Sequence, residues 1–164
     1  MKSKDTRRNF LVVTTKGAGV AAAALGAGGS ALAKEPKLQK RVITRPGQKM
    51  APKAPYSPAI QLGNLVYVSG QIGMDPATQK LAGTFQDEVR QCLENLKAVV
   101  EASGSTMDRV LKCTVFLTDI SNFKAMNEIY ITYFPSDPPA RSTVAVKELV
   151  AGAAIEIDCF TYTG

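Results

Sequence analysis

The chain has 164 residues, with 20 lysine and arginine and 14 aspartate and glutamate side chains, a formal net charge of +6 at pH 7. It contains no histidine and no tryptophan, and its three cysteines, Cys92, Cys113 and Cys159, lie far apart in the sequence. This composition excludes a serine-histidine-aspartate triad and argues against a zinc motif or a disulfide framework. We therefore predict three small, buried, apolar cysteines and no metal site.

The first 33 residues have the features of an export signal. The motif Thr6-Arg7-Arg8-Asn9-Phe10-Leu11 resembles a twin-arginine signal, and an alanine- and glycine-rich run follows at residues 17–33. This run ends in Ala31-Leu32-Ala33, a small-x-small pattern that predicts cleavage near Ala33 and a periplasmic mature protein. The alternative is an uncleaved membrane anchor, for which the run is short and rich in glycine. After cleavage we expect no membrane partner.

Most of the positive charge belongs to this N-terminal segment. Residues 1–33 hold five basic side chains and one acidic side chain, which leaves 15 basic and 13 acidic side chains in residues 34–164. The remainder has a net charge of only +2 and no basic stripe, which argues against nucleic acid as a partner. Its length suits one domain with one core.

The predicted domain follows a charged linker at residues 34–40 and starts with strands. Residues 41–44 predict a short strand. Two apolar runs, residues 59–62 and 65–69, flank the turn pair Gly63-Asn64 and predict a β-hairpin.

Two helices and three strands complete the domain. Residues 85–103 repeat apolar side chains with a 3.6-residue period, which predicts a helix. Residues 109–117 include β-branched side chains in a partly alternating pattern and predict a strand. Residues 123–134 predict a second helix. Residues 141–146 and 154–162 predict the last two strands.

The order of these elements predicts an α+β domain over residues 41–164, with two helices covering one face of a mostly antiparallel or mixed sheet. No helix remains to cover the other face. A second copy of the same chain is the simplest partner for the apolar side chains there.

The strongest candidate site pairs Arg141, at the start of one strand, with Glu156 on the next strand. A guanidinium group matches a carboxylate with two hydrogen bonds, and Glu156 is the one plausible general base in a chain without histidine. The alternatives are an exposed ion pair at Arg141 and a half-buried strand that presents Glu156 to solvent. In the first of these strands Arg141 and Thr143 share one face, so we expect the apolar face to be the other one.

Three further residues are candidates for lining a pocket. Asn127 borders the apolar face of the second helix, and its alternative role is a helix-edge amide bonded to backbone. Tyr56 lies in a proline-bracketed loop and forms either a pocket wall or a plug at the sheet edge. Gly70 ends a hairpin strand and either admits a ligand close to the backbone or serves an ordinary turn.

Taken together, these motifs resemble the RidA (YjgF) family of reactive imine/enamine deaminases, from about Arg41 to Thr161. The ordered matches are Pro55-Tyr56-Ser57, Leu65-Val66-Tyr67-Val68-Ser69-Gly70-Gln71-Ile72, residues 95–104, Lys112-Cys113-Thr114-Val115-Phe116-Leu117, Asn127-Glu128-Ile129-Tyr130, Pro139-Ala140-Arg141-Ser142 and Ile155-Glu156-Ile157-Asp158.

The resemblance implies a chorismate-mutase-like α+β fold and a homotrimer with ligand clefts between subunits. It implies hydrolysis of 2-imino acids, formed from enamines such as 2-aminoacrylate, to 2-oxo acids and ammonia, with no cofactor. One alternative function is a small-ligand-binding or stress-protective trimer of the same fold. Another is a nuclease, but the net charge of only +2 in residues 34–164 argues against it.

Individual roles also follow from the resemblance. Arg141 would grip the substrate carboxylate and Glu156 would orient the attacking water. Tyr56 and Asn127 would line the cleft, and the backbone at Gly70 would contact the ligand.

Ser142 and Thr143 belong to the same implied substrate site, and three positions depart from the family pattern. Thr143 stands where a cysteine is common, Pro58 where a glutamine is common, and Ala54 where a glycine is common. The departures at Ala54 and Pro58 flank Tyr56 and are expected to reshape its loop.

Overall fold

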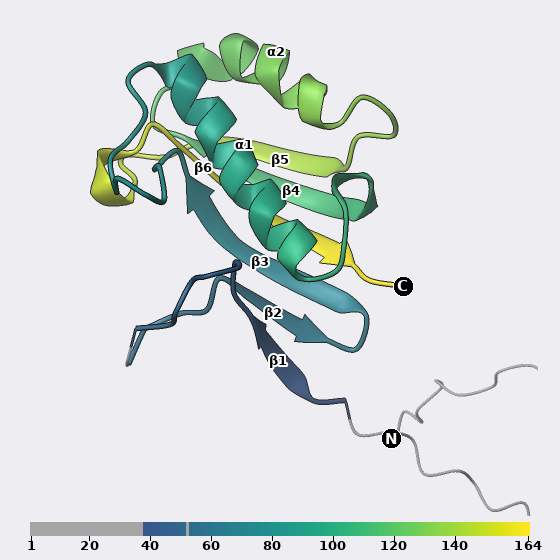
Figure 1. The fold of residues 1–164 in the computed structure, drawn as a ribbon. Helices are drawn as coiled ribbons and strands as arrows, with labels where there is room; N and C mark the ends of the chain where they lie inside the picture. The colour runs from purple at the N-terminus through teal and green to yellow at the C-terminus, as the bar shows by residue number, and fades with distance from the viewer. Residues whose placement is uncertain (1–37, 52) are drawn as a thin grey trace, which may run out of the picture. The chain divides into compact units, whose positions relative to one another are not determined.

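The computed structural model describes residues 38–51 and 53–164 (Figure 1). The predicted signal and most of the predicted linker therefore lie outside the described residues. The strands are β1 (Lys40–Ile43), β2 (Ala59–Leu62), β3 (Leu65–Ile72), β4 (Val110–Leu117), β5 (Ala140–Ala145) and β6 (Ile155–Tyr162). The helices are α1 (Phe85–Ala102) and α2 (Phe123–Tyr133), with single 3-10 turns at Met107–Arg109, Ile120–Asn122 and Val150–Gly152.

The strands form one mixed sheet in the order β1-β2-β3-β6-β4-β5. Only β4 and β5 run parallel, while all other neighbours are antiparallel. Helices α1 and α2 lie on the same side of this sheet (Figure 1). The predicted α+β architecture is confirmed, and the predicted hairpin turns at Gly63, whose φ of +61° suits glycine.

Strand β3 differs from its predicted length because it continues to Ile72. Its pairing with β6 shifts register between Val68 and Gln71, which is a β-bulge around Gly70. The bulge lets the strand resume pairing after the predicted end, so Gly70 lies within the sheet and not beyond it.

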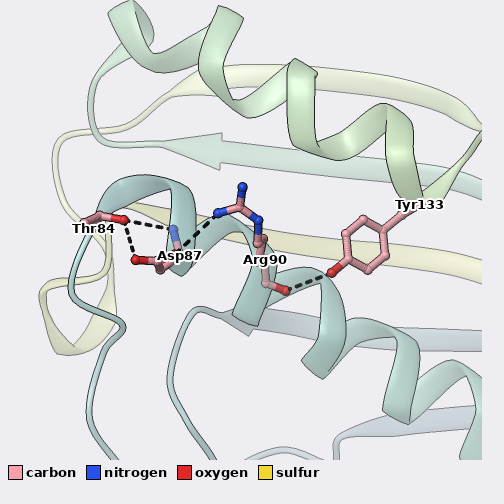
Figure 2. Close-up of polar contacts among 4 residues, drawn as sticks. All are labelled: Thr84, Asp87, Arg90 and Tyr133. Carbon is pink, nitrogen blue, oxygen red and sulfur yellow. Dashed lines mark hydrogen bonds and ion pairs between the residues drawn. The ribbon is translucent and has the colours of Figure 1, made fainter.

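Helix α1 begins where its first-turn N–H groups find an acceptor. The Thr84 hydroxyl accepts the Asp87 N–H at 3.1 Å, and Asp87 pairs with Arg90 at 3.4 Å on the exposed side of the helix (Figure 2). The Tyr133 hydroxyl of α2 reaches the Arg90 carbonyl at 3.5 Å (Figure 2). The same hydroxyl donates to Glu94 Oε1 at 2.7 Å, and these contacts tie the two helices together.

The core fills the space between the helices and one face of the sheet, which we call the covered face. Its sheet residues alternate along the central strands, as a period of two requires. They are Val66, Val68, Cys113, Val115, Leu117, Ile155, Ile157 and Cys159. All three cysteines are buried and free, as predicted, and burial raises the pKa of the Cys113 thiol to about 11. Its thiol is therefore protonated at neutral pH.

Glu88 is a buried carboxylate that the sequence pattern does not single out. It extends from the first turns of α1, and its Oε1 accepts the N–H of Ala154 at 2.6 Å and that of Ile155 at 3.4 Å. Gly73 makes room for it, because a Cβ there would overlap the Glu88 side chain. Glu88 thus fixes the start of β6, one residue before Glu156.

We predict that Glu88→Ala lowers the free energy of unfolding by about 1–3 kcal/mol, because it leaves the N–H groups of Ala154 and Ile155 without an acceptor. Urea unfolding at fixed protein concentration measures this change. Glu88→Gln keeps an acceptor oxygen and should lose less. Glu101→Ala, at an exposed position of the same helix, should stay within about 0.5 kcal/mol. Equal losses for Glu88→Ala and Glu101→Ala would contradict this role.

Candidate functional site

The strand register places Arg141 and Glu156 on opposite faces of the sheet. Arg141 pairs with Cys113 of β4, whose side chain lies in the core, so Arg141 lies on the covered face. Glu156 alternates with the fully buried Ile155 and Ile157 and therefore lies on the other face, which we call the open face. Arg141 and Glu156 were predicted to form one site, but within one protomer they belong to two separate clusters.

The Arg141 cluster consists of Arg141 and the side chains of α2 that hold its guanidinium group. Nη2 donates to Asn127 Oδ1 at 2.7 Å, and the guanidinium carbon lies 4.5 Å from the ring centre of Tyr130 and 5.6 Å from that of Phe123. These cation–π contacts and the amide fix the group without neutralising its charge. The prediction that Asn127 belongs with Arg141 is consistent with this contact.

A cavity of about 330 Å³ opens beside this cluster. Asn127 and Arg141 supply its polar groups, and the remaining lining residues are Tyr130, Ile131, Phe134, Pro138 and Pro139. An unneutralised guanidinium in a mostly apolar cavity suits a small ligand that carries a carboxylate.

The Glu156 cluster consists of Glu156, Asp158 and Gly70. Burial raises the pKa of the Glu156 carboxyl, and the negative charge of Asp158 on the same face raises it further. A Cβ at position 70 would overlap Glu156 Oε1, so the carboxylate packs directly on the glycine backbone at the bulge. A half-buried glutamate with a raised pKa is a stronger base than an exposed one.

The Tyr56 loop lies beside the Gly70 end of this cluster. The Ser69 side chain donates to the Ser57 carbonyl at 2.7 Å, and the Ser69 N–H donates to the Pro58 carbonyl at 3.0 Å. These bonds fix the loop against β3. Tyr56 itself is 70% exposed in the protomer and borders a cavity of about 260 Å³ together with Gly70. Tyr56, which was expected to line the cleft, thus borders the same cavity as Gly70.

Ser142 and Thr143 point to opposite faces. Thr143 pairs with Val115 on the covered face, in line with Arg141. Ser142 lies on the open face, where its hydroxyl lies 2.6 Å from Lys112 Nζ. The apolar face of this strand was expected to be the one without Arg141. Val144 does lie on that face, but it is 44% exposed because no helix covers it, and Arg141 lies on the covered face.

The sequence pattern did not point to three residues of a neighbouring region. Arg45 and Gln48 line the 260 Å³ cavity together with Gly70, and the buried Asn95 of α1 accepts a hydrogen bond from Arg45 Nη1 at 3.2 Å. The one available signal was an asparagine next to the apolar stripe of the first helix, since a buried amide needs partners.

Within residues 38–51 and 53–164, no group of three or more histidine, cysteine, aspartate or glutamate residues is arranged to hold a metal ion. Neither α1 nor α2 has both the length and the apolarity that a bilayer crossing requires.

Comparison with known proteins gives consistent matches. The family model described as Endoribonuclease L-PSP matches residues 46–163. A 2-iminobutanoate/2-iminopropanoate deaminase of Dermatophagoides farinae is 46% identical over 122 residues, which cover 73% of this chain and 93% of that protein.

Two solved structures share the fold. A putative endoribonuclease from Thermotoga maritima is 41% identical with a TM-score of 0.71, covering 77% of this chain and 99% of that chain. E. coli TdcF with bound serine is 34% identical with a TM-score of 0.70, covering 76% and 99%.

The family match spans both clusters and all of the helices and strands except β1. Residues 1–37 lie outside it. The sequence identities and the shared fold agree with the motifs described above. The chain therefore belongs to the RidA (YjgF) family, whose family model is described as Endoribonuclease L-PSP.

Proposed function

We propose that the protein hydrolyses reactive 2-imino acids, formed from enamines such as 2-aminoacrylate, to 2-oxo acids and ammonia. The observation that carries this proposal is that one chain holds two complementary half-sites. The Arg141 cluster suits a carboxylate, and the Glu156 cluster suits a water molecule. The name of the D. farinae relative supports the same reaction.

The chemistry requires orientation more than activation, because an iminium carbon is already electrophilic. Arg141 holds the substrate carboxylate through its planar donor fork. Glu156 accepts a proton from water as the oxygen attacks the C=N carbon. The Glu156 carboxyl then returns this proton to the carbinolamine nitrogen, and the C–N bond breaks to release ammonia and leave the 2-oxo acid.

We also propose that the active form is a homotrimer in which Arg141 of one protomer and Glu156 of its neighbour border one cleft. Leu65, Tyr67 and Phe160 are 42–46% exposed on the open face, and the Tyr67 and Phe160 rings pack 5.1 Å apart. Such an apolar face calls for a partner surface. Light scattering is expected to give about three times the mass of one chain, and a monomer at micromolar concentration would leave each half-site incomplete.

A second candidate function is ligand binding without turnover. E. coli TdcF was solved with bound serine, and the Arg141 cluster suits an amino-acid carboxylate as well as an imino-acid carboxylate. The nuclease suggested by the family description has less support, because residues 34–164 carry a net charge of only +2.

The proposed location is the periplasm, on the basis of Arg7, Arg8 and the small-residue run up to Ala33. Replacement of both arginines by lysine keeps the charge but removes the paired guanidinium signature. The mature form should then no longer reach the periplasm. Unchanged processing would indicate the general secretory route.

We predict that Arg141→Lys loses most imine hydrolysis despite keeping the charge, because an ammonium group cannot form the planar two-bond contact. Glu156→Gln should lower turnover by about 10²-fold or more, while a non-reactive 2-oxo acid still binds. A coupled assay that generates 2-iminopropanoate in situ measures turnover, and calorimetry measures binding. Full activity in Glu156→Gln would disprove its role as the base. Binding without turnover by the unmodified protein would favour the second candidate function.

A further prediction uses the close contact between Gly70 and Glu156. Gly70→Ala adds a Cβ that must displace the carboxylate, so turnover should fall by about 10²-fold, the scale for a misplaced catalytic group. Gly83→Ala is the matched control, because a Cβ there meets nothing within 4 Å. Similar activities for the two variants would show that the position of the Glu156 carboxylate does not limit turnover.

A further inference from the structure

The 260 Å³ cavity beside Gly70 brings residues of two regions together. Gly70 and Tyr56 line it, and so do Arg45 and Asn95. A second cavity of about 610 Å³ adjoins it and shares Arg45 and Asn95 with it. Gly70 also packs against Glu156, so a substrate bound beside Gly70 can place its side chain in the cavity that Arg45 lines.

Arg45 gives the 260 Å³ cavity a positive charge. No other charged side chain lines this cavity, and within residues 38–51 and 53–164 no carboxylate lies within ion-pair distance of Arg45. The 610 Å³ cavity differs, because Glu94 lines it together with Arg45. An anionic group is thus favoured most in the 260 Å³ cavity, where the charge of Arg45 is not opposed.

Contacts through Asn95 hold the Arg45 side chain in the cavity. Asn95 is only 5% exposed, and its Oδ1 accepts hydrogen bonds from Arg45 Nη1 at 3.2 Å and from Gln91 at 3.1 Å. Its Nδ2 donates to the carbonyls of Ile72 at 2.9 Å and Met74 at 2.8 Å. One buried amide therefore fixes Arg45 relative to the strand that carries Gly70.

The guanidinium group keeps donors for a ligand. Of its five N–H groups, one is used by Asn95, and none of the others has a partner among the described residues. An aliphatic side chain such as methyl or ethyl would leave these donors to water. A carboxylate would receive charge-assisted hydrogen bonds from them.

From this geometry we infer that the substrate side chain carries a second carboxylate, so that the preferred substrates are 2-imino dicarboxylates such as 2-iminosuccinate and 2-iminoglutarate. This inference rests on the proposed imine hydrolysis and names its substrate class. Arg141 binds the carboxylate next to the imine, and Arg45 binds the distal one. The reaction adds one water across C=N and releases one ammonia, so no oxidant or reductant is consumed. The class of reaction that supplies such imines is oxidation of acidic amino acids.

The test compares two imines generated in situ by amino-acid oxidases, 2-iminoglutarate from glutamate and 2-iminobutanoate from 2-aminobutanoate. Hydrolysis by the protein competes with capture of the imine by semicarbazide. The unmodified protein should favour 2-iminoglutarate. Arg45→Gln should lower kcat/KM for 2-iminoglutarate by about 10- to 100-fold, the range for one charge-assisted interaction, and change that for 2-iminobutanoate less than about 2-fold.

Lys49→Gln is the matched control, because it removes an exposed charge from the same loop without touching the cavity. It should change neither rate. Equal selectivity of the unmodified protein and Arg45→Gln would overturn the inference, as would an equal loss on both imines, which would assign Arg45 a purely structural role.

A separate measurement keeps this inference distinct from the proposed function. Calorimetry with the non-reactive products should show tighter binding of 2-oxoglutarate than of 2-oxobutanoate, and Arg45→Gln should remove the difference. If the protein hydrolyses neither imine, the proposed function is wrong, and this binding comparison alone decides the role of Arg45. Equal binding of the two products by the unmodified protein would overturn the inferred role of Arg45.

Discussion

The pairing of β4 with both β5 and β6 determines which side chains of the proposed site share a face of the sheet. In this register Arg141 and Cys113 share the covered face, while Glu156 and Phe116 share the open face. Because side chains alternate with a period of two, no rotamer change brings Arg141 and Glu156 to the same side of the sheet. A carboxylate-binding group and a base can therefore meet only where one protomer lies against another. In the proposed trimer, the apolar open face is the surface for that contact.

Each half-site is built from contacts that hold a charge without cancelling it. On the covered face, Asn127 and the rings of Phe123 and Tyr130 orient the Arg141 guanidinium. On the open face, burial and Asp158 raise the pKa of Glu156. The Arg141 cluster thus suits the negative charge of a substrate carboxylate. The Glu156 cluster suits a water molecule that gives up a proton.

The sequence predicted local elements well because their signals are local. The apolar period of residues 85–103, the Gly63-Asn64 turn and the buried cysteines all reappear in the structure. Asn127 and Arg141 are 14 residues apart and were both predicted as site residues from their side-chain chemistry. In the structure Arg141 Nη2 lies 2.7 Å from Asn127 Oδ1.

The long-range pairing could not be predicted from these patterns. Strand β6 inserts between β3 and β4, and β5 runs parallel to β4, so the faces of Arg141 and Glu156 depend on register across distant segments. The alternation of side chains along one strand does not reveal which face of the sheet the helices cover. Arg45 was missed for the same reason, because its partner Asn95 lies 50 residues away on another element.

The central claim is that each complete site combines Arg141 of one protomer with Glu156 of its neighbour. Differently tagged Arg141→Lys and Glu156→Gln chains can be co-expressed, and mixed trimers can be isolated through both tags. In every mixed ring one of the three interfaces joins an intact Arg141 to an intact Glu156, so about one third of the activity of the unmodified protein should return. Mixed trimers as inactive as either parent would contradict the account, because a site contained within one protomer gains nothing from mixing.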